Sequence, residues 1–431
     1  MSDPVLGLLG FCLSLVLIGL GVPVAVSLGI IGLAGFTLVN GLTSAVFIAS
    51  AAPFEALFPY SLSVIPLFLM MGVFSARCGL STDLFLAANT LVGRFRGGLA
   101  MATIGACAGF GAICGSSLAT VATIGRVALP EMRRAGYDDR LASASVAAGG
   151  TLGVMIPPSI LLIIYGLLTE QSIGKLFSAA ILPGLLAVSL YAAAVAVMVR
   201  LNPNLAGPPP ADSRINWAHL RRAWPVAAIF AVVIGGIQGG LFSPTEAAAI
   251  GAAGAVLLAG FRRSLNRTAL WASMYETVSM TGMIALIIVG AALFNAFVET
   301  TGLPQYLISA VEHSGLPPFG VLILIILFYL VLGCFMDSMS MIMLTVPFVF
   351  PLITALGFDP IWFGILVVTV AELGLITPPV GMNLFVIQGV APGLTSATVM
   401  RGILPFIVAD VLRLAVIVLV PALSLYLPSQ M

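Results

Sequence analysis

Two short polar clusters interrupt long apolar runs and carry oxygen atoms that could bind a small cation. The first cluster is Cys114-Gly115-Ser116-Ser117, and the second is Phe335-Met336-Asp337-Ser338. Hydroxyl, carbonyl and carboxylate oxygens suit a hard, singly charged cation such as Na⁺ better than a transition metal. We therefore expect Asp337 to bind sodium. A group that couples transport to protonation and a locally hydrogen-bonded structural acid are the alternatives.

Two segments that combine glycines with a Pro-Pro pair follow these clusters along the chain. They are Gly149–Ser159 and Glu372–Pro379. Proline lacks the N–H group that a helix interior needs, but it fits the first turn of a helix. Each segment therefore predicts a half-helix that ends, an unwound stretch, and a second half-helix that begins. Inside a membrane, unwound backbone is tolerated only where it lines a cavity or contacts an ion.

The clusters and the breaks together define a candidate site. C-terminal ends of half-helices favour cations, whereas N-terminal ends favour an anionic group of a substrate. The predicted sodium ligands are Gly115, Ser116, Ser117, Gly150, Thr151, Asp337, Ser338, Glu372, Gly374 and Thr377. The predicted substrate contacts are Ser117, Pro157, Ser159, Ser338, Pro378 and Asn383. Glu372 could equally brace the second break, and the serines of the clusters could serve only as helix caps.

The elements that must position these residues are membrane helices. Of the 431 residues, 60% are hydrophobic and only 8% are charged, and the mean hydropathy is +1.18. Because soluble proteins carry about 25% charged residues, this composition excludes a soluble enzyme. The net charge of +1 excludes a basic surface for nucleic acid. At about 20 residues per crossing, we expect an all-α polytopic membrane protein with about 10–11 transmembrane helices and two re-entrant hairpins.

The charge pattern predicts that the two hairpins enter the membrane from opposite sides. Arginines flank the first hairpin, 97–131, at both ends, which places both ends in the cytoplasm by the positive-inside rule. Acidic residues and prolines flank the second hairpin, 317–357, which should open outward. Arg126 lies on the first hairpin, and we expect its side chain to extend toward the interface.

The chain also contains an internal duplication. Ser117 and Ser338 stand 221 positions apart, and the same offset relates Pro157-Pro158 to Pro378-Pro379. Together with the opposite hairpin orientation, this offset predicts inverted repeats. The predicted organisation is 1–60 scaffold helices and outer arm, 61–200 first repeat with hairpin 97–131 and broken helix 141–168, 201–277 cytoplasmic connector and scaffold helices, and 278–426 second repeat with hairpin 317–357 and broken helix 361–390.

The polar residues at mid-membrane depth concentrate in one block, about 97–166 with 317–390. The remaining crossings carry few such residues and suit a static scaffold, so we expect an elevator in which the block slides as a unit. A passive channel would not need paired breaks. An intramembrane enzyme would need a nucleophile with a base or a metal set, and the sequence provides neither, nor a phosphate-binding loop for ATP hydrolysis.

Two local features outside the candidate site also carry expectations. Asp410 and Arg413 stand three positions apart on one predicted helix and should form an ion pair. Ser243-Pro244-Thr245-Glu246 matches a capping box with proline at the first helical position. Both features are expected to stabilise the fold.

Several motifs resemble those of a known transporter family. They are Gly97-Gly98-Leu99-Ala100, GSSLATVATIG at 115–125, Pro130-Glu131-Met132, IPPS at 156–159, SPTEA at 243–247 and TPPVG at 377–381. Across nearly the whole chain, the sequence is similar to the large membrane subunit of TRAP (tripartite ATP-independent periplasmic) transporters, the DctM-like family. This family contains all-α elevator-type proteins of the bacterial inner membrane.

The resemblance implies sodium-driven import of organic acids without ATP. It also implies two partners, a small four-helix membrane subunit and a periplasmic binding protein that delivers the substrate. The alternative is a stand-alone symporter of sodium and dicarboxylates that needs no binding protein. Dicarboxylates, sialic acid, hydroxy acids and ectoine-like solutes leave no distinguishing pattern in the sequence, so the substrate class stays open within small organic acids.

Overall fold

The computed structural model describes residues 3–208 and 217–431. Within these ranges the chain is built from helices and contains no strand. Arg214 and part of the expected cytoplasmic connector lie outside the described residues. The all-α fold predicted from the composition is therefore confirmed for the described part of the chain.

The helices of the first half and of the connecting region follow one another with short turns. They are α1 (Asp3–Gly19), α2 (Val24–Leu57), η1 (Tyr60–Ser63), α3 (Val64–Arg77), α4 (Leu80–Val92), α5 (Gly98–Cys114), α6 (Ser117–Arg134), α7 (Asp139–Met155), α8 (Ile160–Leu168), α9 (Ile173–Leu201), η2 (Pro203–Leu205), α10 (Trp217–Gln238) and α11 (Pro244–Phe261). The capping box predicted before α11 is confirmed, because Ser243 Oγ accepts from Glu246 N at 3.3 Å and Ser243 N donates to the Glu246 carboxylate at 2.8 Å.

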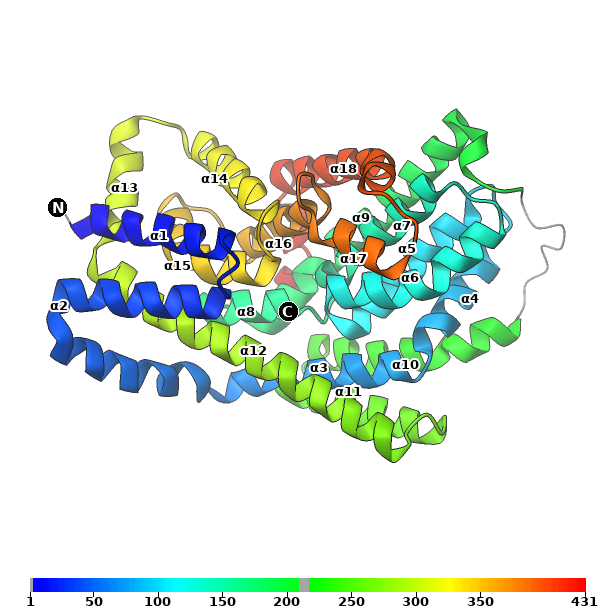
Figure 1. Cartoon of the computed structure of the whole chain (residues 1–431), viewed down its shortest axis with the longest axis horizontal. Coiled ribbons are helices and arrows are strands. Elements are labelled where there is room, and N and C mark those ends of the chain that lie inside the picture. Colours follow the sequence, from blue (N-terminus) through cyan, green and yellow to red (C-terminus); the bar gives the residue numbers. More distant parts are fainter. Residues whose placement is uncertain (1–2, 209–216) are drawn as a thin grey trace.

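The helices of the second half repeat the order of the first. They are α12 (Arg267–Thr300), α13 (Leu303–Ser314), α14 (Pro318–Gly333), α15 (Ser338–Ala355), α16 (Pro360–Ile376), α17 (Met382–Val390), α18 (Ser396–Leu419), α19 (Ala422–Leu425) and η3 (Pro428–Gln430). The series from η1 to α9 and from α12 to α18 each contain a span of membrane length (η1 with α3, or α12), a short amphipathic helix, a hairpin, a broken helix and a long helix. In Figure 1 the first hairpin, α5–α6, lies toward the right end and the second, α14–α15, toward the left.

Eight helices of the described residues are long and apolar enough to cross a membrane, or up to nine when α7 and α8 count as one bent span. Several further helices, among them α1, α5, α14 and α16, are apolar but shorter. Two spans are longer than the sequence predicts. α2 continues past a non-helical residue, Gly41 (φ 80°, ψ 166°), and α12 extends over 34 residues.

Close backbone contacts join the long helices α2 and α12. A Cβ atom at Gly32 would lie 2.5 Å from the backbone nitrogen of Phe294, and one at Gly290 would overlap the Ala25 carbonyl. Figure 1 shows these two helices along the lower left of the molecule. The glycines therefore allow two long helices to pack at a distance that no larger residue would permit.

Candidate functional site

The tip of each hairpin is a helix-capping turn. Gly115 ends α5 with φ +64°, a conformation that glycine adopts without strain. Ser116 then caps α6, and its hydroxyl accepts from Ala119 N at 3.5 Å. At the second tip, Asp337 caps α15 by accepting from Ser340 N at 3.0 Å, and the Ser340 hydroxyl donates to its other oxygen. Ser116 and Asp337 are thus both helix caps, which leaves open whether they also bind an ion.

The breaks are shorter than the sequence predicts. α7 remains helical through Gly150 and Thr151 to Met155, so the unwound stretch covers only 156–159. α16 likewise continues to Ile376 and leaves 377–381 between it and α17. The second half-helices begin at Ile160 and Met382, so the prolines, which the sequence suggested for the first turn of each half-helix, lie inside the breaks instead.

The glycines before each break serve close packing and leave the helix intact. A Cβ atom at Gly153 would lie 2.7 Å from Thr120 Oγ1, and Gly153 faces Gly111 of α5. In the second repeat, a Cβ atom at Gly374 would lie 2.5 Å from the backbone of Gly333 on α14. These two glycine contacts are duplicated, and each one holds a hairpin arm directly against a broken helix.

Both hairpin tips line one cavity of about 670 Å³, which we call the tip cavity. It lies between the tips and the helices α2, α3 and α12. The predicted site residues that line it are Gly115, Ser116, Ser117, Asp337 and Ser338. The wall formed by α12 is mostly apolar and includes Met280, Met283, Ile284, Leu286 and Ile287, with Glu276 as its charged residue. Hydroxyl and carboxylate oxygens on one wall and hydrophobic side chains on the other are the usual composition of a small-molecule site.

Ser338 has a buried hydroxyl group that is free to bond a ligand. Its side chain is 6% exposed, and its hydroxyl oxygen has no hydrogen-bond partner among the described residues. Because a buried hydroxyl without a partner costs free energy, a ligand oxygen or cation at this point would be stabilised. Asp337, beside it, is half-buried and already bonded to Ser340.

Asn383 holds the first tip in place instead of facing the tip cavity. Its side-chain amide donates to Ser117 Oγ at 2.8 Å and to the Ala147 carbonyl at 3.0 Å, and all of it is buried. Because Asn383 belongs to α17 and Ser117 to α6, this contact joins the two repeats. The predicted substrate contact at Asn383 is occupied by a protein partner in this conformation.

Glu372 lies in a buried ionic network that does not line the tip cavity. Arg413 Nη2 contacts Glu372 Oε2 at 2.7 Å and Asp410 Oδ1 at 3.1 Å, so the predicted pair Asp410–Arg413 is confirmed. Tyr191 donates to Asp410 at 2.6 Å, and the Thr151 hydroxyl lies 3.0 Å from Tyr191. All five side chains are fully buried. The structure therefore brings Glu372 and Thr151 to Arg413 and Tyr191, which favours the bracing interpretation of Glu372.

The remaining predicted residues lie near the breaks. Ser159 caps α8 and accepts from Leu162 N at 3.4 Å, and the Thr377 hydroxyl donates to the Leu373 carbonyl at 2.6 Å. Arg126 is exposed on α6. Sequence reasoning missed Ser340, Tyr191 and the α12 wall. The spacing of Met280, Met283, Ile284 and Ile287 on one helical face could have indicated that wall.

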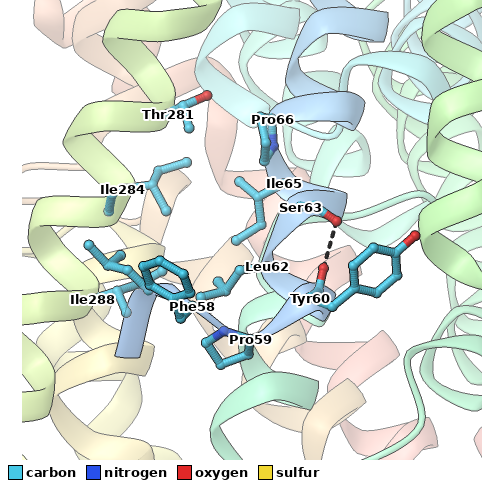
Figure 2. Close-up of a pocket in the computed structure, with 12 residues that line it drawn as sticks. Phe58, Pro59, Tyr60, Leu62, Ser63, Ile65, Pro66, Thr281, Ile284 and Ile288 are labelled. Atoms are coloured by element: carbon cyan, nitrogen blue, oxygen red, sulfur yellow. Dashed lines mark hydrogen bonds between the residues drawn. The ribbon is translucent and has the colours of Figure 1, made fainter. Parts of the chain in front are cut away.

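A second cavity, drawn in Figure 2, has about 360 Å³ and lies between η1, the start of α3 and α12. Its lining is mostly apolar, and Ile284 also borders the tip cavity. The Ser63 hydroxyl donates to the Tyr60 carbonyl at 2.6 Å and is thus already bonded. This cavity offers few polar groups to a carboxylate, so the tip cavity is the better candidate site.

A duplicated set of hairpins and broken helices around one oxygen-lined cavity, within an all-helical apolar chain, defines a polytopic membrane transport protein. A family model described as "Tripartite ATP-independent periplasmic transporter, DctM component" matches residues 11–423. The C4-dicarboxylate TRAP transporter large permease protein DctM of Pseudomonas aeruginosa is 38% identical over 377 residues, which cover 87% of this chain and 88% of that protein. The chain belongs to this DctM family of TRAP transporter permeases, which are proteins of the inner membrane.

Two further similarities extend the comparison. The sialic acid TRAP transporter large permease protein SiaM of Vibrio cholerae is 32% identical over 410 residues, which cover 95% of each chain. Among solved structures, the YdaH transporter of Alcanivorax borkumensis has a TM-score of 0.61 at 16% sequence identity, with 98% of each chain covered. This likeness shows a shared fold and nothing about the substrate.

Proposed function

We propose that this protein is the large subunit of a sodium-driven importer of organic acids that receives its substrate from a periplasmic binding protein. The observation that carries this proposal is the tip cavity, because it collects the polar tips of both repeats against one apolar wall of the scaffold. Membership of the TRAP permease family supports secondary transport. A small membrane subunit completes the proposed complex.

Sodium is proposed as the coupling ion because the tips supply hard oxygen donors. The last carbonyl groups of α5 have no helical partner, and the Ser338 hydroxyl is unbonded among the described residues. Asp337 adds a negative charge at the second tip. In this proposal, a sodium ion bound between such oxygens crosses the membrane together with the substrate.

The substrate is proposed to be a small carboxylate. The relatives' names refer to C4-dicarboxylates for the Pseudomonas protein and to sialic acid for the Vibrio protein, and both compounds carry carboxylate groups. The N-termini of α6 and α15 at the two tips favour a negatively charged group. The apolar α12 wall would contact the carbon skeleton of the substrate.

Movement is proposed to follow the elevator mechanism. Asn383 joins α17 to the first tip, and the Arg413 network joins α7 and α16 to α9 and α18. These contacts bind the two repeats into one unit, which adds α9 and α18 to the block of 97–166 and 317–390 expected from the sequence. The cavity separates this unit, which we call the hairpin block, from the scaffold helices α2, α3 and α12. A stand-alone symporter of sodium and dicarboxylates would share these features. The requirement for a periplasmic binding protein is what distinguishes the proposed importer from such a symporter.

Uptake by purified protein in proteoliposomes tests the proposal. The large subunit, reconstituted with its small subunit, should accumulate a labelled organic acid when an inward sodium gradient and the binding protein are both supplied. Uptake that runs on a proton gradient without sodium would contradict sodium coupling. Uptake at the full rate without the binding protein would favour the stand-alone symporter.

A further inference from the structure

A basic cavity lies at the end of the hairpin block remote from the tips, and the transport function does not use it. The cavity has about 400 Å³, and its lining residues are Asp138, Arg140, Thr395, Ala397, Thr398 and Arg401. It joins the start of α7 in the first repeat to the start of α18 in the second. By the positive-inside rule, this end of the molecule faces the cytoplasm.

Close packing of α18 on α7 creates this cavity. A Cβ atom at Gly402 would overlap the carbonyl of Arg140, so glycine lets α18 touch the backbone at the start of α7. This contact brings Arg401, which precedes Gly402, to the same cavity as Arg140. Arg140 of the first repeat and Arg401 of the second therefore line the same cavity.

The charges around the cavity leave a positive excess. Arg140 Nε and Nη2 both donate to the Asp138 carboxylate, at 3.0 and 2.9 Å, and this hydrogen bonding holds the pKa of Asp138 below its usual range. Arg401 is exposed and forms no ion pair or hydrogen bond with any residue that the structure describes. The lining thus contains two guanidinium groups and one carboxylate, and Arg401 is the cation without a counter-charge.

The hydrogen-bond donors of the cavity suit a tetrahedral anion. Thr395 caps α18 and its hydroxyl lies 2.8 Å from that of Thr398, so two hydroxyl groups and the first amide groups of α18 lie beside Arg401. Guanidinium groups bind phosphoryl oxygens in paired hydrogen bonds, and helix N-termini favour the same charge. Basic pockets between helices on the cytoplasmic side of membrane proteins commonly bind lipid headgroups.

The other repeat shows that the fold alone does not require these arginines. At the opposite end of the molecule, Asp359 occupies the position of Asp138, but Ile361 occupies that of Arg140. Ile181-Leu182-Pro183 of α9 matches Ile403-Leu404-Pro405 of α18, which places Ala179 at the position of Arg401. The same helices therefore form this junction without a basic pair.

We propose that the cavity formed by Arg140, Arg401, Thr395 and Thr398 binds a phosphoryl group at the cytoplasmic face of the hairpin block. The group belongs either to the headgroup of an anionic phospholipid or to free phosphate. The site is separate from the tip cavity, so it does not depend on sodium coupling or on the identity of the organic acid.

Binding measurements on the full chain in nanodiscs test this site. Native mass spectrometry would count phosphatidylglycerol molecules retained in phosphatidylcholine discs, and labelled inorganic phosphate would be titrated into discs of phosphatidylcholine alone. Arg401→Gln should weaken binding about tenfold, since it removes a charge-assisted hydrogen bond, and Arg401→Lys should weaken it less. The matched control is Arg134→Gln, which removes one exposed charge from the same end of the molecule, outside the cavity.

The two arms separate the two sources of the phosphoryl group. Loss of retained phosphatidylglycerol in Arg401→Gln, but not in Arg134→Gln, assigns the site to a lipid headgroup. Saturable phosphate binding that Arg401→Gln weakens assigns it to free phosphate. If both variants retain the lipid equally and phosphate does not bind, the proposal is wrong. Circular dichroism of the variants confirms that exposed Arg401 can be replaced without loss of folding.

Discussion

At the scale of single residues, the carboxylate of Asp337 combines a structural and a proposed functional role. It caps α15 through Ser340 N at 3.0 Å, which stabilises the helix, and it also lines the tip cavity. Glu372 differs, since its carboxylate is fully buried against Arg413. The sequence indicated both acids as intramembrane charges. It could not separate them, because the partner of Glu372 lies 41 positions away on another helix.

Asp337→Asn is expected to impair sodium coupling more than folding. Asparagine keeps the size of the side chain and one acceptor oxygen for Ser340 N, but it removes the negative charge that would compensate the cation. The sodium concentration needed for half-maximal uptake in proteoliposomes should rise. The free energy of unfolding in detergent should fall by less than about 2 kcal/mol, which is the upper range for the loss of a helix cap. An unchanged sodium dependence would assign Asp337 a purely structural role.

Arg413→Met is expected to destabilise the protein strongly. The substitution leaves two buried carboxylates, Glu372 and Asp410, without their cation, and breaking a buried ion pair costs about 3–5 kcal/mol. Thermal unfolding in detergent measures the loss, and exposed Arg126→Met serves as the control. Adding Glu372→Gln to Arg413→Met should restore part of the stability. A double variant as unstable as the single one would show that the network does not act through charge.

At the scale of elements, the sequence predicted the hairpins more accurately than the breaks. The polar clusters and glycines mark the tips directly, and Gly115 and Asp337 are where α5 ends and α15 is capped. The glycine-rich sequence predicts longer breaks than the structure has, because glycine lowers helix propensity. Gly153 and Gly374 remain helical, since each packs against a backbone that is distant in the sequence. Such close contacts between helices are set by tertiary packing, which a local sequence pattern does not predict.

Gly374→Ala should destabilise the second repeat. Its Cβ atom would lie 2.5 Å from the backbone of Gly333, so α14 and α16 would have to separate, at a cost of about 1–3 kcal/mol. Gly389→Ala on α17 is the matched control, because no atom lies within 4 Å of its Cβ position. The control should be neutral or slightly stabilising, since alanine favours helix by up to about 1 kcal/mol. Equal effects of both substitutions on the unfolding temperature would argue against this close contact.

At the scale of the whole molecule, the hairpin block and the scaffold meet at the tip cavity. The two repeats are joined by Asn383 and by the Arg413 network, whereas the scaffold wall facing the tips is mostly apolar. A mostly apolar wall, in which Glu276 is the charged residue, would offer few specific bonds to break in the proposed sliding of the block. The duplication in the sequence indicated the block, but the wall of α12 follows from the packing of α12 on α2 and α3, which the sequence pattern did not reveal.

A cross-link between the hairpin block and the scaffold tests the proposed elevator most directly. Ala119 of α6 and Met283 of α12 both line the tip cavity, so cysteines at these positions in a cysteine-free background can be joined by a bifunctional thiol reagent. Ile229 of α10 and Gly254 of α11 supply the control pair within the scaffold, because a Cβ atom at Gly254 would lie 3.9 Å from Ile229 Cγ1 and neither residue lines the tip cavity. The account predicts that cross-linking Ala119→Cys to Met283→Cys stops uptake in proteoliposomes, while the control cross-link does not. Uptake at the normal rate with the first pair fully joined would contradict a sliding block.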